Sequence, residues 1–190
     1  MHVAQHSPDG VTLYAGSSKG GVWKGALDGT DWTPIGDNLY GGAHWLTVGS
    51  VGEVTRVLAA TDGNLVHYSD DDGVTWTPPS GLIYTHSIRR IAQSTMDSQV
   101  VFLISKDWVY TDSWTTPSSL YRSQDGGKSF EVVRALGGLN ADVFLARDGS
   151  DDTLYLMDQG ALWISEDLGE TWEDRGELPQ VKGARITGSE

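Results

Sequence analysis

The sequence contains no cysteine and few basic residues, and both shortages limit what the protein can do. Without cysteine there is no disulfide and no thiolate chemistry, so nothing indicates the redox compartment. Lysine and arginine number 13 against 26 aspartates and glutamates, which gives a formal net charge of −13. A surface of that charge repels nucleic acid and anionic membranes, so neither is expected as a partner.

Long apolar runs and signal features are also missing. No apolar run approaches the ~18 residues of a membrane span, and no segment has a sustained helical period. The first ten residues, MHVAQHSPDG, lack the basic start and apolar core of a signal peptide. The chain is therefore expected to be either cytoplasmic or a piece of a larger, extracellular or surface-associated protein, and we favour the second.

An eight-residue pattern, S-x-D-x-G-x-[TS]-[WF], occurs three times and is the main positive feature. The pattern residues are Ser69, Asp71, Gly73, Thr75 and Trp76; Ser123, Asp125, Gly127, Ser129 and Phe130; and Ser165, Asp167, Gly169, Thr171 and Trp172. A worn fourth copy runs from Gly25 to Trp32 and keeps only Gly29 and the tryptophan. The copies start at residues 25, 69, 123 and 165, and a spacing of roughly 40–50 residues is typical of four-stranded propeller blades.

The pattern resembles the Asp-box, or BNR repeat, of sialidases, xyloglucan-type glycosidases and sortilin-like receptors. The resemblance implies an all-β propeller of four-stranded antiparallel blades. Because these families share the box and not the chemistry, it implies no particular activity. We expect one propeller region over 1–190, with blades of about 1–36, 37–80, 81–136 and 137–180. Residues 181–190 would be the first strand of a further blade, so about four blades would form a slice of a larger ring.

The box itself has two interpretations. As a turn, it uses the aspartate to accept backbone N–H bonds, the glycine to adopt a positive φ, and the aromatic residue to start the next strand. The alternative is a calcium site at Asp70, Asp71 and Asp72, since hard cations prefer clustered oxygens. The flanking acids are not repeated as a pair in the other copies, which favours the turn.

One insertion breaks the repeat length and is the candidate binding site. In a propeller the box turns all lie on one face, and by resemblance the ligand binds on the other. The 54-residue spacing places extra chain on that ligand face, and it carries Trp108, Tyr110 and Trp114. Aromatic rings interleaved with carboxylates suit sugars, and Asp107 and Asp112 are the weak catalytic candidates. The alternative is a hairpin whose aromatics pack on the next blade.

Other loops expected on the ligand face carry further polar and aromatic residues, namely Asp37, Tyr40, His44, Trp45, Tyr84, His86, Arg89 and Arg90. Arg89-Arg90-Ile91 only faintly resembles the arginine motif of sialidases, so a complete sialidase site is not supported. The histidines lack metal-ligand spacing and no glycine-rich phosphate loop is present, so we expect no metal and no cofactor.

Two functions remain open at this level. The first is a binding scaffold for a glycan or protein, and the second is a glycoside hydrolase or part of one, which needs paired carboxylates. Exposed blade edges would also favour self-association.

Overall fold

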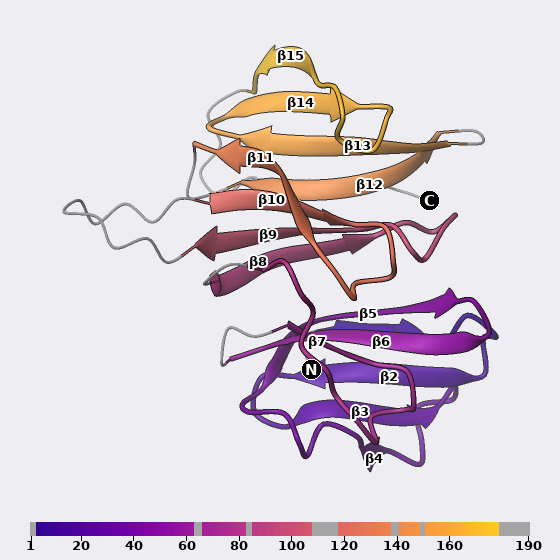
Figure 1. The fold of residues 1–190 in the computed structure, drawn as a ribbon. Helices are drawn as coiled ribbons and strands as arrows, with labels where there is room; N and C mark the ends of the chain where they lie inside the picture. The colour runs from indigo at the N-terminus through magenta and orange to yellow at the C-terminus, as the bar shows by residue number, and fades with distance from the viewer. Residues whose placement is uncertain are drawn as a thin grey trace.

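The computed structural model describes residues 3–62, 66–82, 85–107, 118–137, 141–148 and 151–178, which are built entirely from β-strands and loops. Four antiparallel sheets follow one another along the chain, each a simple meander (Figure 1). No helix in these ranges is long and apolar enough to cross a membrane. The expected all-β class and the repeated sheets are confirmed.

Each sheet starts with its innermost strand and proceeds outward in chain order, as the repeat predicts. The strands of the first two sheets are β1 (Val3–His6), β2 (Thr12–Ser17), β3 (Gly21–Ala26), β4 (Thr33–Pro34), β5 (Ala43–Val51), β6 (Val54–Thr61) and β7 (Val66–Ser69). Those of the other two are β8 (Thr85–Gln93), β9 (Val101–Asp107), β10 (Ser118–Ser123), β11 (Glu131–Leu136), β12 (Asp142–Asp148), β13 (Asp151–Asp158), β14 (Ala161–Ser165) and β15 (Glu173–Glu177).

The second sheet departs from the prediction because it has three strands instead of four. Only an isolated bridge between Tyr68 and Thr77 marks the place of its outer strand. Pro78 and Pro79 follow that bridge, and proline has no N–H to donate to a β-ladder. The chain instead pairs with the third sheet, where the Ser80 N–H donates to the Lys128 carbonyl at 2.9 Å. The two sheets are thus linked at their outer rim.

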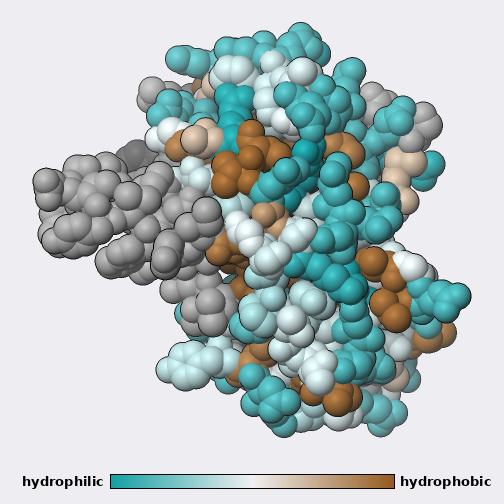
Figure 2. Space-filling view, in the orientation of Figure 1, coloured by the Kyte–Doolittle hydropathy of each residue, from teal (hydrophilic) through white to brown (hydrophobic). Residues whose placement is uncertain are grey.

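The sheets pack face to face in chain order and form three apolar cores. Alternation along each second strand divides its side chains between two neighbours. Tyr14 packs toward the second sheet, Leu58 toward the third and Phe102 toward the fourth. No extensive contact joins the first and fourth sheets within the described ranges, so these sheets form an open arc. The visible surface is mostly hydrophilic, with separate apolar patches (Figure 2).

The meander also fixes where the loops lie. In four antiparallel strands, the connections from first to second and from third to fourth strands leave one face of the arc. The connections from second to third strands, and from each sheet to the next, leave the opposite face. The three pattern copies are third-to-fourth connections, so they share one face, and any ligand site on the other face is built from different loops.

Candidate ligand-binding site

The three full copies of the pattern form the same hydrogen-bonded turn. In the first, the Ser69 hydroxyl donates to Asp71 Oδ1 at 2.8 Å and accepts from the Gly73 N–H at 2.8 Å. Thr75 donates to the same carboxylate from its N–H at 2.8 Å and from its hydroxyl at 2.7 Å. The same set of bonds recurs in the other two copies, where Ser123 and Ser165 accept from the glycine N–H groups and Asp125 and Asp167 accept from the remaining donors.

These bonds lower the pKa of the aspartates, because they favour the charged form. The hydroxyl of Thr171 is the main cause for Asp167, whose pKa falls to about 2. The Thr75 hydroxyl acts in the same way and lowers the pKa of Asp71. Burial works to raise the pKa of Asp125, but bonds from Ser129 and Ser123 lower it overall.

The worn first copy reaches a similar turn with a different carboxylate. Asp28 stands one residue after the expected position, which Leu27 occupies. Its Oδ1 accepts from the N–H of Thr30 at 3.0 Å and from the Thr30 hydroxyl at 2.6 Å. The turn therefore tolerates a shift of one residue that the pattern could not reveal.

The acidic run at 70–72 does not converge on a common point. Asp70 accepts from Arg56 at 2.5 and 2.8 Å, whereas Asp71 serves its own turn. Asp72 accepts from the hydroxyl of Tyr14 at 2.6 Å and from Lys24 at 2.8 Å. Since the three carboxylates serve three separate sets of donors, this arrangement gives no support to the calcium alternative.

The predicted binding residues Trp108, Tyr110, Trp114 and Asp112 lie outside the described residues, as does Tyr84. The backbone of Asp107 is the last position of β9, at the face opposite the pattern turns, and its side chain is outside the description. The insertion therefore remains a prediction.

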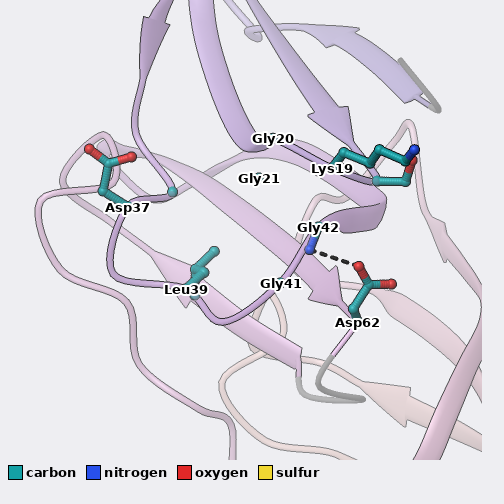
Figure 3. Close-up of a pocket in the computed structure, with 10 residues that line it drawn as sticks. Lys19, Gly20, Gly21, Asp37, Leu39, Gly41, Gly42 and Asp62 are labelled. Atoms are coloured by element: carbon teal, nitrogen blue, oxygen red, sulfur yellow. Dashed lines mark hydrogen bonds between the residues drawn. The ribbon is translucent and has the colours of Figure 1, made fainter.

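An open hollow of about 530 Å³ lies on this opposite face, between the first and second sheets. Its walls come from the β2–β3 loop, the β4–β5 loop and the end of β6 (Figure 3). The lining residues are Ser18, Lys19, Gly20, Gly21, Gly36, Asp37, Leu39, Gly41, Gly42 and Asp62. Tyr40, in the same loop as Asp37, is 83% exposed. The sequence had pointed to Asp37 and Tyr40 but not to Lys19 or Asp62.

Asp62 holds the hollow together. Its Oδ2 accepts from the N–H of Gly42 at 2.9 Å (Figure 3). Its Oδ1 contacts His44 Nε2. Gly42 has no room for a side chain, because a Cβ there would lie 2.0 Å from the Ser18 carbonyl oxygen. A similar bond recurs in the fourth sheet, where Asp158 accepts from the N–H of Gly137 at 2.9 Å. In both sheets an aspartate at the end of the second strand therefore binds the backbone of the segment that leads into the first strand of the same sheet.

The comparisons with known proteins agree with this geometry. The model of the BNR/Asp-box repeat matches residues 67–78. The GH74 xyloglucanase from Xanthomonas campestris superposes with a TM-score of 0.61 at 17% identity over 90% of this chain. The fold is that of an Asp-box β-propeller. An ancestral GH74 enzyme gives a TM-score of 0.66 at 18% identity over all of this chain, and Sqt1 from Saccharomyces cerevisiae gives 0.56 at 10% over 90%.

The propeller chain spans 29% and 24% of the two GH74 chains and 46% of Sqt1. No curated protein sequence matches it. At these identities the solved structures establish the fold alone.

Each of the three full boxes also receives a donor from the preceding blade. Lys24 of the first blade reaches Asp72 of the second. Arg56 of the second blade donates to the Asp125 carbonyl of the third at 2.6 Å, and Arg122 of the third donates to the Leu168 carbonyl of the fourth at 3.0 Å. The boxes are thus docking elements between blades.

Arg90, the second residue of the arginine pair, also takes part in the packing between blades. The Arg90 guanidinium lies 5.1 Å from the Trp45 ring of the preceding blade, and its Nε is 3.6 Å from Asp142 of the following one. A cation above an aromatic face and beside a carboxylate is already compensated. This arrangement favours a packing role for Arg90.

Proposed function

We propose that this propeller region binds a neutral glycan through the hollow between its first two blades. The observation that carries the proposal is the hollow itself, which is open, lies away from the boxes, and is lined by the polar side chains of Lys19, Asp37 and Asp62. The exposed Tyr40 belongs to the loop that supplies Asp37. The volume of the hollow is within the range of small-molecule sites. Lys19 can donate to sugar hydroxyls and Asp37 can accept from them, while a tyrosine ring can stack on the apolar face of a sugar.

Hydrolysis is the second candidate, supported by two carboxylates on one hollow and by the fold shared with the GH74 xyloglucanases. A glycosidase needs one acid to protonate the leaving group and a second to attack or to activate water. Asp62 already contacts the Gly42 N–H and His44, so its carboxylate supports the loop. Because only Asp37 projects from the hollow without a described partner, binding is favoured over catalysis.

The role proposed here implies a location outside the cell, at its surface or in the periplasm, where glycan polymers are met. The proposal is based on the described residues of a chain that covers less than a third of the length of each GH74 chain. The activity of any larger protein that contains this region is part of the proposal.

The test is a titration with xyloglucan oligosaccharides, followed by calorimetry, of the wild-type chain and three variants. Tyr40→Ala and Asp37→Asn should each weaken binding about tenfold, which corresponds to the loss of about 1.4 kcal/mol. Val74→Ala is the matched control, since Val74 is 72% exposed but lies in a box on the other face. It should leave the affinity unchanged, and all melting temperatures should stay within about a degree.

Reducing-sugar release measured in parallel separates the two candidates. Binding without release supports the scaffold, whereas release that Asp37→Asn abolishes would replace it with hydrolysis. Equal affinity of the wild type, Tyr40→Ala and Asp37→Asn for the oligosaccharide would remove the hollow as the site.

A further inference from the structure

Strand β5 carries an extra residue close to the hollow. In its pairing with β6, Ala43 lies opposite Thr61 and Trp45 lies opposite Ala60, so His44 between them has no residue opposite it. This is a β-bulge, and a bulge turns a side chain out of the regular alternation of a strand. Ala43 is fully buried, whereas the side chain of His44 is exposed. The bulge therefore presents an imidazole at the surface.

Asp62 joins this imidazole to the wall of the hollow. One carboxylate oxygen, Oδ1, contacts His44 Nε2, and the other, Oδ2, accepts from the Gly42 N–H at 2.9 Å. The two contacts use different oxygens, so both are present at once. The backbone N–H of Asp62 also donates to the Gly42 carbonyl at 2.8 Å. Both backbone polar groups of Gly42 are thus bonded to Asp62, one of them through the carboxylate that His44 contacts.

The chain at Gly42 is closely packed on both sides. A Cβ on Gly42 would lie 2.0 Å from the Ser18 carbonyl oxygen, and a Cβ on Gly41 would lie 2.7 Å from Asp62 Cβ. The φ of Gly41 is 84°, which glycine adopts without strain. Since the end of the β4–β5 loop fits between Ser18 and Asp62 with no spare room, a change in the forces on Asp62 is transmitted to the loop.

The same loop carries two residues on which the proposed function depends. Leu39 is buried and anchors the middle of the loop. Asp37 and Tyr40 lie on either side of this anchor and are exposed. Because Tyr40 is followed closely by Gly42, its position depends on how firmly Asp62 holds the end of the loop.

We infer that His44 is a positioning residue of this site and that its protonation tightens glycan binding. The inference rests on the proposed function and adds its regulation by pH. Histidine is the side chain that ordinarily changes charge between about pH 5 and pH 8. A protonated imidazole forms a charge-assisted bond to the Asp62 carboxylate, which is stronger than the bond of a neutral ring. The loop is then ordered before the ligand arrives, and binding no longer has to supply that ordering.

The effect is moderate because water reaches both partners. His44 and Asp62 are 42% and 44% exposed, and exposed ion pairs contribute little. The other charged groups on the walls of the hollow are Lys19 and Asp37, and Arg90 lies over the aromatic ring that follows His44 in β5. Of these groups only His44 is of the residue type that titrates near neutral pH. We expect the affinity to rise about two- to fivefold between about pH 8 and about pH 5.5.

Nuclear magnetic resonance of the free chain tests the link between His44 and the loop without any ligand. The amide proton of Gly42 should shift between about pH 5.5 and about pH 8, because the carboxylate that it binds loses a cationic neighbour. This shift should be absent in His44→Gln. It should be unchanged in the control His6→Gln, because His6 contacts the Ser7 carbonyl at the face of the boxes. A Gly42 amide that does not respond to pH in the wild type, or that responds equally in His44→Gln, would overturn the inference.

Calorimetry with xyloglucan oligosaccharides then measures the affinity at the two pH values. Wild type and His6→Gln should bind about two- to fivefold more tightly at the lower pH. His44→Gln should bind equally at both, and so should Asp62→Asn, which keeps an oxygen for the Gly42 N–H but loses the charge.

The other outcomes separate this inference from the proposed function. Equal affinity of the wild type at both pH values, or a pH dependence that survives in His44→Gln, would overturn the inference and leave the proposed function standing. A dependence that is lost in His44→Gln but kept in Asp62→Asn would mean that His44 contacts the ligand directly, which overturns its positioning role. Absence of binding by the wild type at either pH would remove the proposed function, and the pH-dependent affinity with it.

Discussion

All three full boxes have a glycine at the same position, and replacing it measures how much the contact of each box with the preceding blade contributes to stability. Gly73, Gly127 and Gly169 all have positive φ, at 83°, 89° and 93°, so replacement by alanine costs the same left-handed strain of about 1–2 kcal/mol in each. The gain from stiffening the unfolded chain is also common to all three. Any difference among the three alanine variants must therefore come from what the new methyl group meets in the preceding blade.

The structure gives each methyl group a different neighbour. At Gly169 the nearest atom is Phe102 Cε1 at 3.6 Å, an ordinary contact, so Gly169→Ala should cost only the strain. At Gly127 the methyl would lie 2.9 Å from Leu58 Cδ1, and repacking a buried leucine adds about 1–3 kcal/mol. At Gly73 it would lie 2.4 Å from the Ile35 carbonyl oxygen, which is backbone and cannot rotate away. That oxygen also accepts the Trp76 indole N–H at 2.8 Å, so Gly73→Ala should cost most.

Urea unfolding of the three variants, followed by tryptophan fluorescence, measures the order. We expect the loss of unfolding free energy to rise from Gly169→Ala through Gly127→Ala to Gly73→Ala, with a spread of at least about 2 kcal/mol. Equal losses in all three would mean that the box is only a local turn and that its contact with the preceding blade contributes little. A largest loss for Gly169→Ala would contradict the packing described here.

Two further predictions concern charge. The pKa of Asp167 is lowered in the folded state, so its bonds stabilise the protein fully above about pH 4 and are lost as the pH falls toward about 2. The free energy of unfolding of Asp167→Asn should therefore depend less on pH in this window than that of the wild type. Glu166→Gln is the control and should keep the pH dependence of the wild type. Arg56→Met should cost about 2–3 kcal/mol in urea unfolding, because Arg56 is 3% exposed and donates to Asp70 and to two carbonyls of the next blade, whereas Lys24→Met, with its exposed partner Asp72, should cost less than about 1 kcal/mol.

Most of the fold could be predicted because the repeat specifies it at several levels at once. The spacing of the boxes predicted successive four-stranded antiparallel sheets, and the structure has four antiparallel sheets in chain order, three of them with four strands. The repeat predicted a fourth strand in the second sheet, which has three, although Pro78 and Pro79 already argued against that strand. Proline removes the donor that a ladder needs, and that local fact outweighs the repeat.

The candidate site was harder to predict because it is made by neighbours across blades. Asp37 and its neighbour Tyr40 were found from their loop, but Lys19 and Asp62 come to line the hollow with Asp37 only through the packing of two sheets. No spacing in the sequence brings residues 19 and 62 together. One signal was available in retrospect: Asp62, Asp107 and Asp158 all stand at the ends of second strands, and two of them accept a backbone N–H from an entering chain.

The division of labour between the two faces explains why the Asp-box says so little about chemistry. Each box uses its serine, aspartate and threonine to fix a turn, and uses its glycine and aromatic residue to meet the blade before it. All of these contacts lie on one face of the arc or at the interfaces between blades. The loops of the other face contain no box, so apart from close contacts such as Gly42 on Ser18 their length and residues can change more freely. A ligand site can therefore differ completely between two proteins whose boxes are superimposable, and the loops that line the hollow are where we propose to test for one in this chain.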